Sequence, residues 1–198
     1  MTSEMRLSQR FLEALSFAAE LHLNQRRKGT DIPYVSHILA VASIVMESGA
    51  TEDEVIAALL HDAVEDWGGR PMLEQIRLRF GETVAATVEG CTDAYVEPKP
   101  AWKPRKEAYI AHLRDPRTSP SVRLVSAADK LHNARAILRD YRQLGERLWS
   151  RFSGGREGTL WYYSAVVDAL KSGGLTPAVQ ELEEVVREMQ SLAAAVAG

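Results

Sequence analysis

The sequence has 198 residues, of which 45% are hydrophobic and 26% charged, and its formal charge at pH 7 is −3. This length predicts a single domain, and the composition excludes an intrinsically disordered chain and a collagen-like repeat. The net negative charge disfavours a general nucleic-acid-binding protein, although it does not exclude a small basic pocket.

Apolar residues recur every three to four positions through the first part of the chain, which predicts amphipathic helices. The first helix covers Leu7–Leu23, and the polar segment Asn24–Pro33 after it is expected to be a loop. A second helix is expected over Ser36–Glu47, closed by Ser48 and Gly49.

The third predicted helix begins at a capping box, in which the Thr51 hydroxyl and the Glu54 carboxylate satisfy free backbone N–H groups. It is expected to continue to about Asp66. Between Val55 and Val64 it is apolar on nearly every face, apart from polar side chains close to its end. Such a helix should be buried at the centre of the domain.

Helical periodicity continues through the rest of the chain, with a Pro-rich loop at Asp93–Pro104 and a Gly-rich break at Ser153–Gly158. No stretch alternates as a strand would, so we predict an all-α helical bundle that forms one domain over 1–198. The further helices expected are Pro71–Phe80, Glu82–Thr92, Arg105–Arg114, Pro120–Tyr141, Leu160–Lys171 and, within the C-terminal segment 176–197, Ala178–Ala197.

The cysteine content and the N-terminal segment indicate in which cellular compartment the protein is expected. Cys91 is the single cysteine, so no intrachain disulfide can form. The first residues lack the apolar segment of a secretory signal, and the longest apolar run, Val55–Leu60, is far too short to span a membrane. We therefore expect a cytoplasmic protein.

Four polar residues lie at the end of the predicted buried helix: His61, Asp62, Glu65 and Asp66. Three carboxylates packed in an apolar setting repel one another and lose hydration, so a cation must compensate for them. A divalent metal ion fulfils this role, because imidazole and carboxylate groups together suit manganese, iron, zinc or magnesium. The alternative is that the acidic end of the helix projects into solvent.

Two residues elsewhere in the chain favour the metal site. His37 lies at the start of the second helix, and Asp129 lies within the apolar stretch of a later helix, where an unpartnered carboxylate is costly to bury. With His61 and Asp62, these residues supply ligands from three helices and leave room for water. The remaining histidines are interpreted as surface or packing residues: His22, His112 and His132.

In this order, the four residues resemble the HD metal-dependent phosphohydrolase superfamily. The segments around them narrow the resemblance to the hydrolase domain of the RelA/SpoT family; they are Arg27–Gly29, Pro33–His37, Ala57–Asp66 and Ala128–Asn133. The resemblance covers residues 17–170. Because no synthetase or regulatory region is expected after it, the chain is similar to the stand-alone small alarmone hydrolases.

The resemblance implies a role for each matching position. One divalent metal, usually Mn²⁺, would be held by His37, His61, Asp62 and Asp129. Glu65 and Asp66 match the catalytic acidic pair of the family. Arg27 and Lys28 match its basic pair, which contacts the nucleotide and could neutralise the released pyrophosphate, and Asn133 falls where the family contacts the nucleoside.

The implied reaction is hydrolysis of the 3′-pyrophosphate of ppGpp or pppGpp, which gives pyrophosphate and GDP or GTP. The segment Thr159–Tyr163 departs from the aromatic and acidic pattern of the family, so adenosine alarmones such as ppApp stay open as substrates. An HD-type 5′-nucleotidase and a catalytically silent nucleotide-binding module are the alternatives. The expected partner is a small nucleotide, with no nucleic acid or membrane, and a homodimer contact through the C-terminal helix is left open.

Overall fold

The structure is a computed structural model, which describes residues 6–96 and 98–196. Within these ranges no strand is present, and the one β-type contact is an isolated bridge between Arg26 and Pro33. The predicted all-α class is therefore confirmed. In chain order the elements are α1 (Gln9–Leu21), α2 (Val35–Glu47), α3 (Glu52–Leu60), α4 (Ala63–Trp67), α5 (Gly69–Phe80), α6 (Glu82–Cys91), α7 (Trp102–Arg114), α8 (Pro120–Leu144), the 3₁₀ helix η1 (Gly145–Arg151), α9 (Gly155–Lys171) and α10 (Pro177–Val196).

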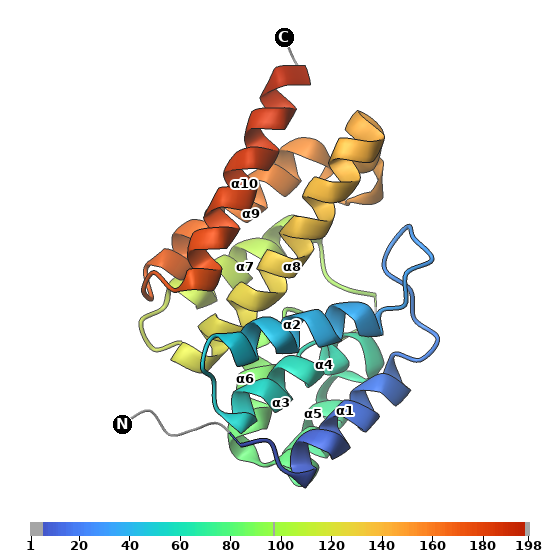
Figure 1. Ribbon diagram of the computed structural model, residues 1–198, viewed down its shortest axis with the longest axis vertical. Helices are drawn as coiled ribbons and strands as arrows, with labels where there is room; N and C mark the ends of the chain where they lie inside the picture. Colours follow the sequence, from blue (N-terminus) through green and yellow to red (C-terminus); the bar gives the residue numbers. More distant parts are fainter. Residues whose placement is uncertain (1–5, 97, 197–198) are drawn as a thin grey trace.

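The helices pack around two clusters of buried apolar side chains. Figure 1 shows α1–α5 in the lower part of the molecule and α9 and α10 in the upper part, with α8 extending from one to the other. Helices α1–α6 supply most of the first cluster, and α7, η1, α9 and α10 supply much of the second. The long helix α8 belongs to both, because Val125 and Ala128 join the first cluster whereas Leu131 and Ala134 join the second. A polar side chain near the middle of α8 therefore lies at the junction of the two halves.

Helix α8 begins as the sequence predicts. Ser119 is its N-cap, and the backbone N–H of Val122 donates to the Ser119 hydroxyl oxygen at 3.2 Å. The helix continues past the expected end at Tyr141, and the chain then turns at Gly145, where φ is +56°. The 3₁₀ helix η1 that follows was not predicted, and its apolar residues pack into the second cluster.

The first part of the expected third helix is confirmed. The backbone N–H of Glu54 donates to the Thr51 hydroxyl at 3.4 Å, and the backbone N–H of Thr51 donates to the Glu54 carboxylate at 2.7 Å. Every residue from Val55 to Leu60 is buried. This helix is thus central, as its apolar composition predicts.

The second part of that helix differs from the prediction of one continuous helix to Asp66, which is wrong. Helix α3 ends at Leu60, a turn follows at His61 and Asp62, and α4 begins after it. The Nδ1 atom of His61 lies 2.8 Å from the carbonyl oxygen of Ala58. In a continuous helix the backbone N–H of Asp62 would use that carbonyl. The imidazole therefore replaces a backbone hydrogen bond at the point where the helix breaks.

Two other helices begin earlier than predicted. Helix α5 starts at Gly69 and includes Pro71, and α7 starts at Trp102 and includes Pro104. Proline is tolerated in a first turn because the backbone N–H it lacks would have no acceptor there. A proline therefore marks the first turn of a helix without fixing its first residue.

The C-terminal part agrees in outline with the sequence prediction. Helix α9 starts at Gly155, within the expected break, and α10 ends the described part of the chain, whereas the expected last helical residue, Ala197, lies outside the described residues. None of the helices in the described ranges has the length and apolar content to cross a bilayer.

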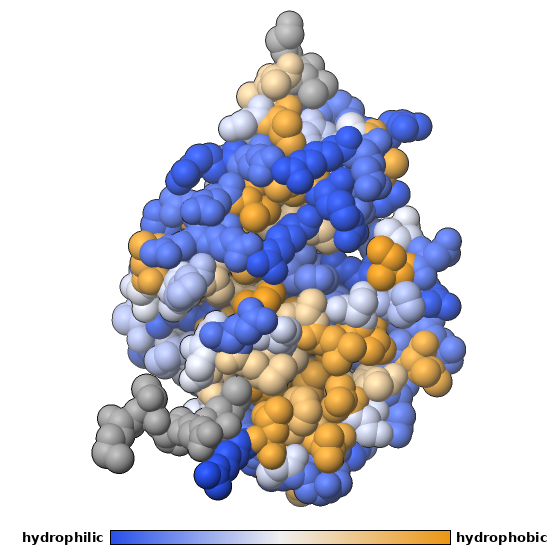
Figure 2. Space-filling model, viewed as in Figure 1, coloured by the Kyte–Doolittle hydropathy of each residue, from blue (hydrophilic) through white to orange (hydrophobic). Residues whose placement is uncertain are grey.

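The face seen in Figure 2 is divided by polarity. Charged side chains cover α8 and α10, where Arg135 pairs with Glu181 across the two helices. Hydrophobic side chains gather over α1 and α2, and Leu12 and Leu39 are among the exposed apolar residues of these helices. Exposed ion pairs add little stability, so the apolar contacts beneath them hold α10 against α8.

Candidate functional site

Three of the four predicted metal ligands meet at the junction of the two halves. The donor atoms of His37, His61 and Asp129 all lie within 4.8 Å of one another, and the three residues are buried. Asp129 Oδ1 lies 3.2 Å from Nε2 of His37 and 3.7 Å from Nε2 of His61. The packing of α2 and α8 against the end of α3 thus brings together side chains far apart in sequence.

The fourth predicted ligand, Asp62, approaches the same two imidazoles. Its Oδ2 atom lies 2.9 Å from Nε2 of His61 and 3.5 Å from Nε2 of His37. The phenol of Tyr34 donates a hydrogen bond to this oxygen at 2.6 Å. Two carboxylates and two imidazoles therefore face a common centre.

The hydrogen bonds around this centre fit a divalent metal ion. The Nδ1–H of His61 must donate, because its partner is the carbonyl oxygen of Ala58. The neutral imidazole then carries a lone pair on Nε2, and the buried Nε2 atoms of His61 and His37 have no hydrogen-bond partner. Lone pairs of this kind beside carboxylates form a donor set that suits divalent metals of the first transition row.

The charges at the centre also favour a cation. Burial opposes the charged form of His61, but the carboxylates of Asp62 and Asp129 raise its pKa well above the ordinary value. Burial would raise the pKa of Asp62, but His61 and His37 hold that pKa well below its ordinary value. Burial would also raise the pKa of Asp129, but Lys130 and then the two histidines hold that pKa well below its ordinary value. Both carboxylates therefore stay ionised and attract positive charge, either a proton or a metal ion.

His132 has a specific role in this arrangement, which corrects its interpretation as a surface or packing residue. Its Nδ1 atom lies 2.7 Å from Nδ1 of His37. Burial, followed by the proximity of His37 and Arg27, lowers the pKa of His132 to about 4, so its ring is neutral at pH 7. In the tautomer in which His132 accepts the Nδ1–H of His37, Nε2 of His37 carries a lone pair directed at the centre.

The predicted catalytic pair lies beside the centre and outside the metal-binding set. Glu65 Oε1 accepts a hydrogen bond from Lys99 Nζ at 2.7 Å, and Asp66 accepts one from the side-chain amide of Gln25 at 2.8 Å. Burial, followed by the charges of Asp93 and Asp62, raises the pKa of Glu65, whereas Lys99 lowers it. Glu65 is thus a base whose ionisation depends on its lysine partner.

Two cavities are lined by residues that neighbour the predicted metal ligands in sequence or contact them. The large cavity, about 860 Å³, is lined by Glu65, and the small cavity, about 240 Å³, is lined by Tyr34 and Asn133. Tyr34 donates to Asp62, and Asn133 donates to Asp129, so the small cavity is bordered by hydrogen-bond partners of the two carboxylates. Four residues line both cavities: Lys28, Ile137, Phe152 and Tyr163.

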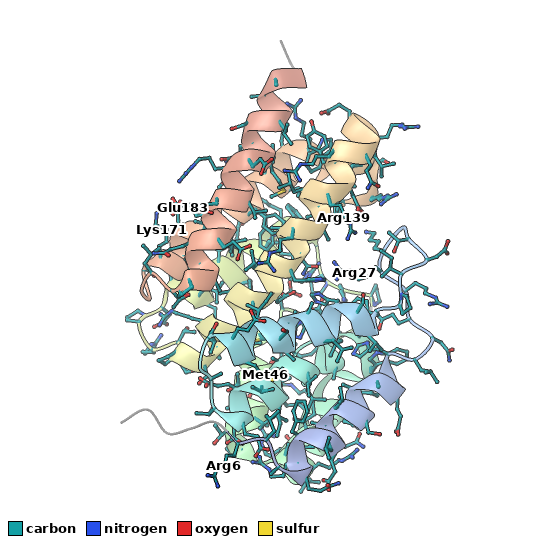
Figure 3. All side chains as sticks on the ribbon, viewed as in Figure 1. Arg6, Arg27, Met46, Arg139, Lys171 and Glu183 are labelled. Carbon is teal, nitrogen blue, oxygen red and sulfur yellow. The ribbon has the colours of Figure 1, made fainter. Side chains whose placement is uncertain are left out.

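The predicted substrate-binding residues are divided between these cavities. Arg27 lines the small cavity, where its Nη2 atom donates to Asn133 Oδ1 at 2.8 Å, and Lys28 lines both cavities. Asn133 also donates to Asp129 Oδ1 at 2.6 Å. Arg27 of the loop and Arg139 of α8, both labelled in Figure 3, line the small cavity. Asn133 thus links the small cavity to a metal ligand.

A group of cations that sequence reasoning missed lines the large cavity: Lys99, Arg105 and Lys106. Arg105 and Lys106 each contact Asp93 at 2.5 Å, and Lys99 contacts Glu65. The sequence signal was a set of cations within the Pro-rich loop and directly after it. Their spacing in the sequence does not indicate that Lys99 contacts Glu65, which lies in the earlier helix α4.

We expect that His132→Ala weakens divalent metal binding about 10–100-fold, because loss of a residue that orients a metal ligand has effects of this size. The measurement is calorimetric titration of the metal-free protein with Mn²⁺, with circular dichroism as a check of folding. His112→Ala is the matched control, since this exposed histidine lies on α7, away from the centre. Unchanged Mn²⁺ affinity in folded His132→Ala protein would contradict the role of His132.

Comparison with known proteins agrees with this geometry. The HD domain family matches residues 14–160. The MESH1 protein of Xenopus tropicalis, named guanosine-3′,5′-bis(diphosphate) 3′-pyrophosphohydrolase, is 42% identical over 142 residues, covering 70% of this chain and 73% of the relative. The Homo sapiens protein of the same name is 36% identical over 181 residues, covering 90% of this chain and 91% of the relative.

Solved structures show the same similarity. A metazoan ortholog of SpoT, described as hydrolysing ppGpp, superposes with a TM-score of 0.73 at 31% identity, over 92% of this chain and 97% of that one. A protein from Listeria monocytogenes EGD-e gives 0.66 at 30% identity, over 80% of this chain and 99% of that one. Sequence and structure together establish that this chain belongs to the HD domain family.

Proposed function

We propose that this protein hydrolyses the 3′-pyrophosphate of guanosine 3′,5′-alarmones, ppGpp or pppGpp, and releases pyrophosphate with GDP or GTP. The names of its relatives support this substrate class. The observation that carries the proposal is the large cavity, which is lined by Glu65 and by a group of cations: Lys28, Lys99, Arg105 and Lys106. Such a cluster suits a pyrophosphate group, which carries more negative charge than a monophosphate.

The metal-binding residues in this proposal are His37, His61, Asp62 and Asp129, and the ion is Mn²⁺. When bound, a divalent ion makes water more acidic and offsets charge on phosphate oxygens. The chain itself keeps the ligands in place: the Ala58 carbonyl and His132 orient the imidazoles, and Tyr34 and Asn133 bond to the carboxylates. Partners of this kind fix the orientation of each ligand before substrate arrives.

Glu65 is the proposed general base, with Asp66 helping to orient the attacking water. The water oxygen forms a bond to the phosphorus attached to the ribose 3′-oxygen, and the bond between that phosphorus and the 3′-oxygen breaks. Glu65 takes the proton from the water, and the 3′-oxygen gains a proton to become a hydroxyl. Lys99 favours the ionised form of Glu65, which this role requires.

The two cavities divide the substrate between them in this proposal. Arg27 and Asn133 face the nucleoside in the small cavity. The pyrophosphate lies in the large cavity against Lys99 and its neighbours, and Lys28 reaches both parts. The pyrophosphate contact that the sequence assigned to Arg27 is therefore proposed for Lys99, Arg105 and Lys106 as well as Lys28.

An HD-type 5′-nucleotidase is the alternative enzyme. A nucleoside monophosphate offers no pyrophosphate for the cations of the large cavity, so this alternative leaves them without a function. A catalytically silent module is disfavoured because all four metal-binding positions meet and Glu65 adjoins them. The cytoplasmic location and a dimer contact through α10 stay predictions from the sequence.

We expect the Mn²⁺-loaded protein to release pyrophosphate from ppGpp and to hydrolyse dAMP poorly. The reason is that transition-state stabilisation in the large cavity needs a substrate with charge to place there. Products are identified by anion-exchange chromatography after separate incubations with ppGpp, ppApp and dAMP. Orthophosphate from dAMP with no turnover of either alarmone would replace the proposal by the nucleotidase.

Glu65→Gln is expected to lower kcat by roughly 10²–10⁴-fold, the usual contribution of a general base, with the Mn²⁺ content unchanged. Metal content is measured by elemental analysis of the same samples used for kinetics. The matched control is Glu74→Gln, on the exposed side of α5. Loss of metal in Glu65→Gln protein would instead assign Glu65 to the metal-binding set.

Lys99→Gln is expected to move the acid limb of the kcat–pH profile to higher pH. Glu65 must be ionised to act as a base, and Lys99 lowers its pKa, so removal of the lysine raises that pKa. Activity is then lost at a higher pH as the solution is acidified. Lys103→Gln is the control, because Lys103 lies over the ring of Trp161 instead. An unshifted acid limb in Lys99→Gln protein would show that Glu65 does not titrate in this limb.

A further inference from the structure

His22 is a buried imidazole that the proposed mechanism does not use. It is the C-cap residue of α1, and it is 0% exposed. Its ring stacks on that of Tyr34, with centroids 5.0 Å apart, and its Nδ1 atom lies 2.5 Å from Oε1 of Gln25. His22 is therefore not the surface residue that the sequence allowed, and its polar contacts exceed what packing alone requires.

The side chain of Gln25 connects His22 to the proposed catalytic pair. Its Nε2 atom donates to Oδ2 of Asp66 at 2.8 Å. An ionised carboxylate only accepts hydrogen bonds, so the amide nitrogen must face Asp66 and the amide oxygen must face His22. The amide oxygen is also only an acceptor, so Nδ1 of His22 must carry a hydrogen. The three side chains thus form one directed chain of hydrogen bonds, which runs from His22 through Gln25 to Asp66.

A second contact tests this choice of tautomer. The indole Nε1 of Trp67 lies 3.3 Å from Nδ1 of His22 and could donate to it if the hydrogen were on Nε2 instead. The buried Nε2 atom has no hydrogen-bond partner among the described residues, so a hydrogen there would have no acceptor. Trp67 is 43% exposed, so water can accept its N–H. The contact with Gln25, which is also the shorter one, therefore sets the tautomer.

The ring of His22 also supports a metal-binding carboxylate. Tyr34 donates to Oδ2 of Asp62 at 2.6 Å, and the His22 ring lies against the Tyr34 ring at an interplanar angle of 26°. The backbone N–H of Tyr34 donates to the carbonyl oxygen of Gln25 at 2.9 Å. His22 thus contacts two side chains that each hold a carboxylate of the site, Gln25 for Asp66 and Tyr34 for Asp62.

Asp66 needs this support because its other oxygen faces a cation. Its Oδ1 atom lies 3.6 Å from Nζ of Lys99, which donates to Glu65 at 2.7 Å. Without the amide of Gln25, the Asp66 carboxylate is free to turn toward Lys99 and to compete with Glu65 for it. The hydrogen bond from Gln25 holds Asp66 in one orientation and leaves Lys99 to Glu65.

We propose that His22 is a positioning residue for the reaction. Its Nδ1–H orients the amide of Gln25, and that amide fixes Asp66 beside Glu65. This inference rests on the proposed function for the role of Asp66. His22 acts only through its neighbours: its N–H serves turnover through Gln25, whereas its ring supports Tyr34 by packing.

Three substitutions separate the N–H of His22 from its ring. His22→Phe keeps a ring against Tyr34 and removes the N–H, and Gln25→Leu removes the next group in the chain. Each is expected to lower kcat for pyrophosphate release from ppGpp about tenfold or more, with KM and Mn²⁺ content unchanged, because loss of a supporting hydrogen bond has effects of this size. His22→Asn returns an amide N–H close to the position of Nδ1, so it should recover most of kcat while the loss of the ring lowers the melting temperature.

The double variant His22→Phe, Gln25→Leu should lose no more activity than Gln25→Leu alone, because groups that act in one chain are not additive. His112→Phe and Gln75→Leu are the matched controls, at exposed positions on α7 and α5. Circular dichroism and thermal melting show which variants are folded. Kinetics and metal content are measured on the same samples.

A measurement on the full wild-type chain tests the hydrogen-bond chain without any substrate. Long-range ¹H–¹⁵N NMR spectra of the neutral His22 ring report which nitrogen carries the hydrogen. We expect it on Nδ1 in the wild-type protein and on Nε2 in Gln25→Leu protein, in which Trp67 is the remaining polar neighbour of Nδ1.

Three results would overturn the inference: a hydrogen on Nε2 of wild-type His22, a normal kcat in folded His22→Phe and Gln25→Leu proteins, or a kcat of His22→Asn no higher than that of His22→Phe. Failure of the proposed function has a different signature. In that case the wild-type protein releases no pyrophosphate from ppGpp, while the NMR spectra still decide whether His22 donates to Gln25.

Discussion

The structure depends on two carboxylates and two imidazoles that meet at one point. Lys130 pairs with Asp129, but this one cation does not balance both Asp62 and Asp129. Burial of unpaired charge costs several kcal/mol, so the centre favours further positive charge. The neighbouring polar groups hold these four side chains in position. Ala58 and His132 hold the imidazoles, and Tyr34 and Asn133 bond to the carboxylates. The break between α3 and α4 also contributes to this arrangement. The His61 ring bonds to the Ala58 carbonyl oxygen, which would accept a backbone N–H if the helix continued.

Helix α8 connects this centre to the rest of the site. Its middle joins the two apolar clusters, so Asp129 lies where α2 and the end of α3 can reach it. About one further turn brings Asn133, and about two more bring Asp140, to the wall of the small cavity. One rigid element therefore sets the distance between the metal centre and the far end of the small cavity. Rigid elements position reacting groups more accurately than loops do.

Charge is distributed unevenly in a chain whose formal charge is −3. The large cavity gathers cations from three segments, which are the loop at Lys28, the Pro-rich loop at Lys99, and the first turns of α7. Glu65 and Asp93 lie among them and keep the cluster from being uniformly positive. A pocket of this kind attracts an anion locally while the surface as a whole stays acidic. Net charge is thus informative about solubility, but it does not determine whether a given pocket prefers an anion or a cation.

The sequence by itself determined the helical class, the central helix with its capping box, and three residues that the structure gathers into a group able to hold a metal ion: His37, His61 and Asp129. These follow from local periodicity and from residue types that are costly to bury without a cation. Tertiary structure alone decided that His132 orients His37, that Lys99 reaches Glu65, and that Asp140 pairs with Arg151 beside the small cavity. The contacts of His132 and Lys99 depend on how helices and loops pack, and that of Arg151 depends on a 3₁₀ helix that the sequence did not predict. Helical periodicity predicts neither the packing nor the 3₁₀ helix.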